Sequence, residues 1–173
     1  TQDVEVVTVP TAGFTTEQTE GCAPFTLTLN NTASANATDF TYTATGAVPP
    51  VSSNPNPTFT FPAAGQYTII QSASNAAGSS TDTLAISVGD VPDAGFEGTI
   101  TPGSTLLELT NSSLGATDFA WDFGDGNTST ASVPSHVYTA DGTYQVNLIA
   151  SNACGADTVA QSFTVITPPV AAI

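Results

Sequence analysis

Trp121-Asp122-Phe123-Gly124-Asp125-Gly126 is the stretch that predicts the fold of this 173-residue chain. Alternate side chains of a β-strand point to the same face, so the rings of Trp121 and Phe123 would both enter a core. The aspartates and glycines beside them are residues that form and tolerate tight turns. The stretch therefore predicts a buried strand that ends directly in a turn.

The same stretch belongs to an internal repeat. Residues 116–121, which run into it, repeat residues 37–42, and residues 150–155 repeat residues 73–78. Spacings of roughly 80 residues indicate two copies of one module. In the first copy the motif has become Tyr42-Thr43-Ala44-Thr45-Gly46-Ala47, which contains neither aspartate.

Most of the chain outside the motif carries strand patterns. Apolar and polar residues alternate in short runs such as Phe25-Thr26-Leu27-Thr28-Leu29, and Gly, Asn, Asp and Pro separate these runs. Good helix formers other than Ala are scarce, and Met, Lys and Arg are absent. Short strands at this spacing predict an all-β fold of two tandem immunoglobulin-like β-sandwich domains.

The repeats also predict the domain boundaries. We expect the first domain, with the degenerate motif, at residues 10–89 and the second at residues 90–167. Residues 1–9 are similar to the end strand of a preceding module or to a linker, and residues 168–173 are similar to the start of a following module. The chain is therefore expected to be a window on a longer tandem array.

The second module adds two further stretches to the motif, Pro134-Ser135-His136-Val137-Tyr138 and Gly142-Thr143-Tyr144-Gln145-Val146. Together they resemble the PKD domain, an immunoglobulin-like sandwich common in bacterial surface and secreted proteins. The resemblance covers most of residues 92–167, and the assignment of the first module rests on the repeat. It implies an extracellular spacer or adhesion module.

The charge of the chain excludes several classes of partner. It contains 15 acidic residues, no Lys or Arg and one His, which gives a formal net charge of −15. Nucleic acid and anionic lipid surfaces are bound by basic side chains, and there are none here. No apolar run approaches the roughly 18 residues of a membrane span, so we expect no membrane insertion.

His136 is the single histidine, so any histidine-dependent catalytic or zinc site would have to use it. Its counterpart in the first module is Phe59, and that of Tyr138 is Phe61, which indicates that these positions need rings. Without Lys or Arg there is also no Schiff-base amine and no guanidinium for an anionic substrate. We therefore expect a structural histidine and no enzymatic activity.

The aspartates of the motif are the candidate metal ligands. Asp122 and Asp125 are candidates for a weak calcium site, together with Asp90 and Asp93 of the linker. Calcium takes six to eight oxygen ligands, and two carboxylates fall short of that number. Turn formation is the simpler account of the motif aspartates, and no other cofactor is expected.

Two threonines are candidate modification sites. Asp82-Thr83-Leu84 and Asp157-Thr158-Val159 occupy what the sequence suggests are equivalent positions of the two modules. Both triplets resemble the Asp-Thr/Ser-aliphatic signal for bacterial O-glycosylation, which implies glycans on Thr83 and Thr158. Coincidence is the alternative, because threonine is so frequent in this chain.

The two cysteines are expected to form a disulfide bond. Cys22 lies between the first two expected strands of module one, and Cys154 lies in the turn before the last strand of module two. In an antiparallel seven-stranded sandwich these turns lie at the exit and the entrance of their modules. The strand count therefore predicts a bond across the linker. The alternatives are two free thiols or a bridge to another chain.

These observations favour a non-catalytic structural or adhesive segment of an extracellular surface protein or filament. The expected partners are neighbouring modules of the same array, and uniform negative charge would oppose self-association. One alternative is a module that binds surface polysaccharide or matrix, which would need exposed aromatic rings. Another is an accessory module of a secreted hydrolase.

Overall fold

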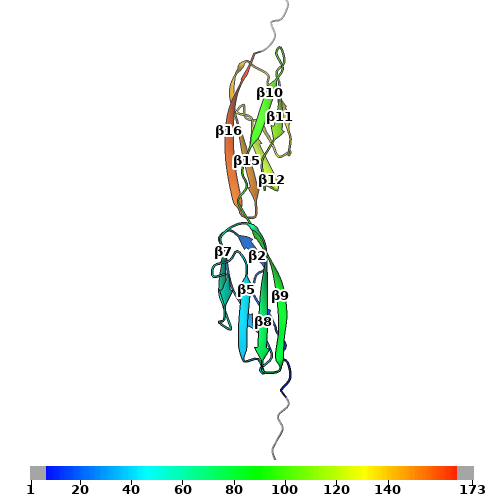
Figure 1. Ribbon diagram of the computed structural model, residues 1–173. Helices are drawn as coiled ribbons and strands as arrows, with labels where there is room; N and C mark the ends of the chain where they lie inside the picture. The colour runs from blue at the N-terminus through cyan, green and yellow to red at the C-terminus, as the bar shows by residue number, and fades with distance from the viewer. Residues whose placement is uncertain (1–6, 167–173) are drawn as a thin grey trace, which may run out of the picture. The chain divides into compact units, whose positions relative to one another are not determined.

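The computed structural model describes residues 7–166 and divides the chain into two compact units, Thr1–Asp90 (unit 1) and Val91–Ile173 (unit 2). All the regular secondary structure found in residues 7–166 is β-strand, which confirms the all-β class (Figure 1). Over this range there is accordingly no helix of the length and hydrophobicity needed to cross a membrane. The end strand expected within residues 1–9 lies mostly outside the described residues, and the module start expected at 168–173 lies wholly outside them.

Unit 1 is built from two layers of strands. One layer is the five-stranded sheet β2-β9-β8-β5-β6, and the other consists of the pairs β1-β4 and β3-β7. The strands are β1 (Phe14–Thr15), β2 (Glu20–Cys22), β3 (Phe25–Thr28), β4 (Asn30–Asn31), β5 (Asp39–Ala44), β6 (Val51–Ser52), β7 (Thr58–Phe61), β8 (Gly65–Asn75) and β9 (Gly78–Gly89).

Unit 2 has the same two layers, with sheet orders β13-β12-β15-β16 and β10-β11-β14. Its described residues form the seven strands expected of the module. They are β10 (Phe96–Ile100), β11 (Leu106–Asn111), β12 (Asp118–Asp122), β13 (Thr128–Ser129), β14 (Ser135–Val137), β15 (Gly142–Asn152) and β16 (Gly155–Val165).

Alternation along the strands produces a separate core in each unit. On β15, Val146, Leu148 and Ala150 are fully buried while the residues between them are not. Two-residue periodicity places every second side chain between the layers, where burial of apolar area stabilises the sandwich. The largest buried side chains are Tyr42, Phe59, Phe61, Leu29, Ile69 and Ile86 in unit 1, and Trp121, Tyr138, Leu107, Leu148 and Val146 in unit 2.

The last two strands of each unit form a long hairpin, and the two hairpins correspond residue by residue when counted from the turn. Asn75 lies opposite Gly78 in unit 1, and Asn152 lies opposite Gly155 in unit 2. Both glycines have positive φ, 143° and 147°, a backbone conformation that favours glycine. Equivalent residues of the two hairpins are therefore 77 positions apart in the sequence, along the whole hairpin.

This register corrects the expected equivalence of the two Asp-Thr pairs. Asp157 is the counterpart of Ser80, and Thr158 is the counterpart of Thr81, so Asp82-Thr83 lies two residues further along its strand. The expected equivalence was wrong because the hairpin register, and not the residue type, defines equivalent positions. A shift of two residues leaves the side chains on the same face of the sheet.

Ser80 and Asp157 hold the opening segment of their own units in the same way. Ser80 Oγ accepts a hydrogen bond from the backbone N–H of Ala12 at 2.7 Å, and Asp157 Oδ2 accepts one from Ala94 at 2.8 Å. Backbone hydrogen bonds lower the pKa of Asp157, and the largest contribution comes from Ala94. A hydroxyl and a carboxylate therefore serve the same structural purpose at one position of the module.

The two units differ in how they begin. In unit 2, β10 pairs with β11 over its whole length. In unit 1, β1 ends at Thr15, and the chain crosses to the other layer, where β2 runs parallel to β9. Cys22 was expected between two strands but lies at the end of β2, opposite Gly89, the last residue of β9.

Candidate functional site

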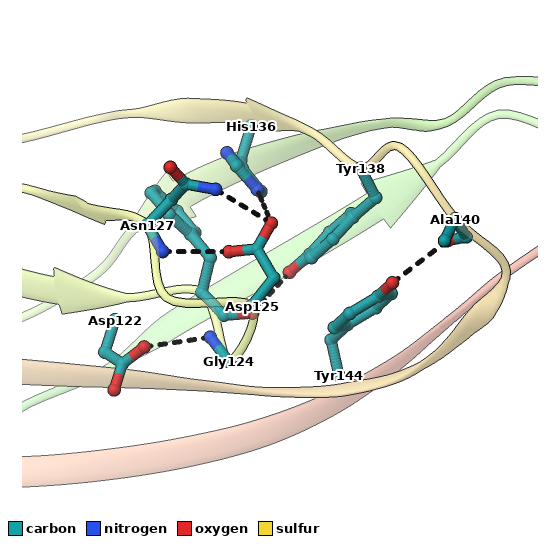
Figure 2. Close-up of polar contacts among 9 residues, drawn as sticks. Asp122, Gly124, Asp125, Asn127, His136, Tyr138, Ala140 and Tyr144 are labelled. Atoms are coloured by element: carbon teal, nitrogen blue, oxygen red, sulfur yellow. Dashed lines mark hydrogen bonds and ion pairs between the residues drawn. The ribbon is translucent and has the colours of Figure 1, made fainter.

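The motif forms the turn between β12 and β13. The Asp122 side chain accepts a hydrogen bond from the Gly124 N–H at 2.9 Å, and Asp125 Oδ1 accepts one from the Asn127 N–H at 3.0 Å (Figure 2). Gly124 and Gly126 have positive φ, 78° and 91°, as a tight turn requires. Both motif carboxylates are thus used to hold the backbone of the turn.

His136 joins this turn to β14. Its Nε2 donates a hydrogen bond to Asp125 Oδ2 at 2.7 Å, and its ring stacks on Phe123 with centroids 4.2 Å apart and an angle of 5° between the planes. The His136 and Asp125 side chains are only 12% and 18% exposed. Ring packing on one side and a charge-assisted hydrogen bond at the edge orient the imidazole.

Two tyrosines continue the cluster beneath the histidine. The Tyr138 hydroxyl donates to the Phe123 carbonyl at 2.9 Å, and its ring stacks on Tyr144 at 4.0 Å. The Tyr144 hydroxyl donates to the Ala140 carbonyl at 3.0 Å (Figure 2). Burial raises the pKa of Tyr138 to about 12, and the negative charge of Asp125 adds to that rise. Tyr138 is thus a neutral donor near pH 7.

Electrostatics at the turn favour the ionised form of Asp125. Burial by itself would raise the pKa of this carboxyl, but hydrogen bonds from His136 and Asn127 outweigh that effect and hold the pKa below its ordinary value. Charged hydrogen-bond acceptors are stabilised in this way whenever several N–H groups converge on them.

The cluster offers little to a substrate or a metal. Asp125 already accepts hydrogen bonds from Asn127 and His136, and in residues 7–166 no three His, Cys, Asp or Glu side chains are grouped to hold a metal ion. The other two calcium candidates lie elsewhere in the fold. Asp90 follows β9 of unit 1, and the backbone of Asp93 pairs with Leu114 of unit 2. A calcium site at these residues stays a prediction.

In unit 1, a different residue occupies the position that corresponds to His136. Phe59 lies opposite Leu27 just as His136 lies opposite Leu107, so the structure supports the expected counterpart of the histidine. Unit 1 therefore has an aromatic ring at this position but no imidazole. The stretch 42–47 contains no carboxylate to take the place of Asp125.

Unit 1 also contains a buried polar network that the sequence did not predict. Gln71 is fully buried, and its Oε1 accepts from the Gly13 N–H at 2.6 Å while its Nε2 donates to Tyr42 at 2.7 Å and to Asn31 at 2.9 Å. The hairpin register places Leu148 at this position in unit 2. A polar residue in the alternating run 67–71 was the only sequence signal of this network.

The remaining candidate residues lie on the strands. Thr83 and Thr158 are exposed on β9 and β16, where their side chains are accessible to a modifying enzyme. Both cysteines are disulfide-bonded, and the part of the chain that the structure describes holds no free cysteine. The expected disulfide chemistry is therefore confirmed, while the glycans on both threonines stay predictions.

Both units match models of a known protein family. Models of the PKD domain match residues 13–88 and residues 89–167. The PKD1 domain of Vibrio anguillarum Epp is 28% identical, with 46% of this chain and 99% of that chain covered and a TM-score of 0.43. The PKD1 domain of the Vibrio cholerae metalloprotease PrtV is 32% identical, with 44% and 98% covered and a TM-score of 0.41.

A more distant structure shares the fold across both units. The variant titin fragment I67–I69 is 18% identical, with 93% of this chain and 67% of that chain covered and a TM-score of 0.56. The search of curated proteins found no match. PKD domains are commonly non-catalytic extracellular modules of bacterial secreted proteins. The two matched ranges span most of the chain, and the protein therefore belongs to the PKD domain family, of which it contains two tandem copies.

Proposed function

We propose that this pair of PKD domains is a non-catalytic extracellular spacer, a rigid segment that carries other parts of a surface protein away from the cell. The observation that supports it most is the exchange of His136 for Phe59 between the two units. A catalytic or binding site would need its imidazole, whereas a packing position needs only a ring. The motif carboxylates are likewise occupied in holding their own turn.

The disulfide supports the same function. Cys22 lies opposite Gly89 at the end of unit 1 where the chain leaves it. Cys154 lies in the β15–β16 turn, and a Cβ on the adjacent Gly155 would lie 2.6 Å from Val91, the first residue of unit 2. Each cysteine thus lies near the linker within its own unit. We propose a bond between Cys22 and Cys154 that limits hinge motion at the linker.

Peptide mapping tests the pairing directly. The chain has no Lys or Arg for trypsin to cut, so a protease that cuts at Asp or Glu is used instead, without reductant. A linked peptide containing Cys22 and Cys154 is expected, and reduction should split it. A covalent dimer on a non-reducing gel would contradict the proposed pairing.

The spacer function predicts that the disulfide stiffens the pair. Small-angle scattering and residual dipolar couplings should show one dominant arrangement of the domains in the oxidised chain. The double variant Cys22→Ser/Cys154→Ser, with each domain still folded, should sample a broader range of arrangements. If both proteins sampled an equally broad range of domain arrangements, the disulfide would not stiffen the pair. Turnover of a glycan or peptide substrate that is abolished in His136→Phe would argue for an enzyme.

A further inference from the structure

The different openings of the two units leave one sheet edge uncovered in unit 1. In unit 2, residues 98–100 of β10 lie opposite residues 107–109 of β11. In unit 1, β1 ends at Thr15, and residues 16–19 leave for the other layer. Within residues 7–166, β7 is the only strand paired with β3, so β3 has one edge with no strand beside it.

The uncovered edge is the counterpart of a covered one. Leu27 lies opposite Phe59 in the same way that Leu107 lies opposite His136. Residues 27–29 of unit 1 therefore correspond to residues 107–109 of unit 2, which residues 98–100 cover. One extended segment that the module accommodates in unit 2 has no equivalent beside β3 in the described part of unit 1.

An open pocket lies at this edge. It has a volume of about 420 Å³ and polar walls, and its lining residues are Thr16, Glu17, Gln18, Thr26, Leu27, Thr28 and Asn30. The Thr16 hydroxyl donates a hydrogen bond to the Thr28 carbonyl at 3.2 Å, which shows that this carbonyl faces the pocket. The pocket therefore combines an accessible strand edge with side chains that can hydrogen-bond.

We propose that this pocket binds an extended peptide segment of another protein, which adds to β3 as an antiparallel strand. Unpaired strand edges recognise extended peptides through main-chain hydrogen bonds. The register of residues 98–100 on β11 indicates the geometry, in which one peptide residue lies opposite Thr28.

Charge defines the chemistry of the partner. Glu17 lines the pocket, and the whole chain has a net charge of −15 with no Lys or Arg. An acidic peptide would be repelled, a basic one would be attracted, and a neutral one would be neither repelled nor attracted. The partner is therefore an extended segment without acidic side chains. This inference does not depend on the spacer function, because either could fail while the other holds.

A synthetic peptide tests the proposal. The probe Lys-Gly-Thr-Ile-Thr-Lys copies residues 98–101 between two lysines, and it is titrated into the complete ¹⁵N-labelled chain. The amide signals of Thr26, Thr28 and residues 16–18 should shift, and exchange of the Thr28 amide should slow. Residues 107–109 provide the internal control, because β10 already covers them. A peptide with Pro in place of the first Thr, which copies Thr99, lacks the required N–H and should not bind.

Variants of the pocket sharpen the test. Thr16→Val removes the hydroxyl that competes for the Thr28 carbonyl, so the affinity for the probe should rise about two- to tenfold. Glu17→Gln should lower it about two- to fivefold through loss of charge attraction. The matched control Glu97→Gln removes a charge from β10 of unit 2 and should leave the affinity unchanged.

Three results would overturn the proposal. The first is no shift at Thr26 and Thr28 at millimolar probe. The second is equal shifts in both units or equal binding of the proline peptide, either of which indicates unspecific attraction to an acidic surface. The third is that a neutral oligosaccharide shifts the pocket residues while the peptide does not, which would make the pocket a saccharide site.

Discussion

At the residue scale, the two units solve the same packing problems with different side chains. Trp121 fills the core of unit 2, and its indole N–H donates to the Ala131 carbonyl at 2.9 Å. Tyr42 takes this place in unit 1 and donates to the Pro55 carbonyl at 2.8 Å. The smaller Tyr42 ring has Gln71 beside it, which bonds to the hydroxyl. Each buried polar atom is thereby paired, as burial requires.

The first prediction concerns Gln71. Replacement by Leu, the residue of unit 2, leaves the Gly13 N–H without its acceptor and should destabilise unit 1 by about 1–3 kcal/mol. In unit 2 the equivalent Gly95 N–H donates to Ser113 Oγ at 3.1 Å, and the unit 1 counterpart of Ser113 is Ala33. Adding Ala33→Ser to Gln71→Leu should therefore recover part of the loss.

In urea unfolding, the fluorescence of the single tryptophan, Trp121, reports unit 2 alone, whereas tyrosine fluorescence reports both units because each contains two tyrosines. A tyrosine transition that is absent from the Trp121 signal therefore belongs to unit 1. Only the unit 1 transition should move in the Gln71→Leu variants. A recovery of the same size from Ala33→Ser in the wild-type background would contradict the proposed exchange of hydrogen-bond acceptors.

The second prediction follows from the lowered pKa of Asp125. A carboxyl whose pKa is lower in the folded state stabilises the fold fully above its unfolded value near 3.8, and this contribution is lost as the pH falls through the lower folded value. His136→Phe removes one of the hydrogen bonds that lower the pKa while it keeps a ring on Phe123. The variant should therefore lose less stability than the wild type between pH 5 and pH 2.

Urea midpoints of both proteins, read from Trp121 fluorescence over this pH range, measure the effect. The other carboxyl groups are common to both proteins and cancel in the difference. Parallel curves would mean that His136 does not hold Asp125 in its ionised form.

At the scale of elements, the β12–β13 turn of unit 2 lies close against the neighbouring strand. A Cβ on Gly124 would lie 2.5 Å from the Gln145 carbonyl oxygen, on the neighbouring strand β15. A Cβ on Gly126 would have no neighbour within 4 Å. The turn therefore needs the first glycine for two reasons, its positive φ and the close approach of β15, and the second glycine only for its φ.

The third prediction compares these two glycines. Gly126→Ala should cost about 1–2 kcal/mol, the usual penalty for a left-handed non-glycine residue. Gly124→Ala should cost clearly more, because its methyl group must also displace the backbone of β15. Thermal unfolding monitored by Trp121 fluorescence measures both. Equal losses would show that β15 can move away at little cost.

At the scale of the whole molecule, negative charge has almost no internal compensation. Among the described residues, the contact between His136 and Asp125 is the one contact found between a carboxylate and a side chain that is able to carry a positive charge. The remaining carboxylates repel one another at distances that salt can screen. The same charge steers the chain away from acidic partners.

The fourth prediction is that salt stabilises the chain. If screening between low and moderate ionic strength contributes about 1 kcal/mol, the melting temperature should rise by about 4–8 °C. Calcium at matched ionic strength should give the same rise if it acts only by screening. A larger rise that disappears in Asp122→Asn/Asp125→Asn would reveal a specific calcium site at the motif, and no rise with either salt would contradict the charge argument.

Much of the architecture could be predicted because its signals are local. Strand alternation and turn residues operate over a few positions, and the motif 121–126 combines both. The ring requirement at His136 was also visible, because Phe59 stands at the same place of the repeat. The partners of Gln71 could not be predicted, because Gly13, Asn31 and Tyr42 lie on separate segments that only the folded sandwich brings together.

The sequence by itself determined the all-β class, the two repeated modules, the family and the packing role of the motif. Only the tertiary structure decided three features: the hairpin register that makes Asp157 the counterpart of Ser80, the crossing of β2 to the other layer and the open edge of β3. The physical reason is that a shift by two residues, or a change of layer, preserves the alternation of apolar and polar side chains. Hydrogen bonds between distant segments distinguish such arrangements, and these bonds form only in the folded domain.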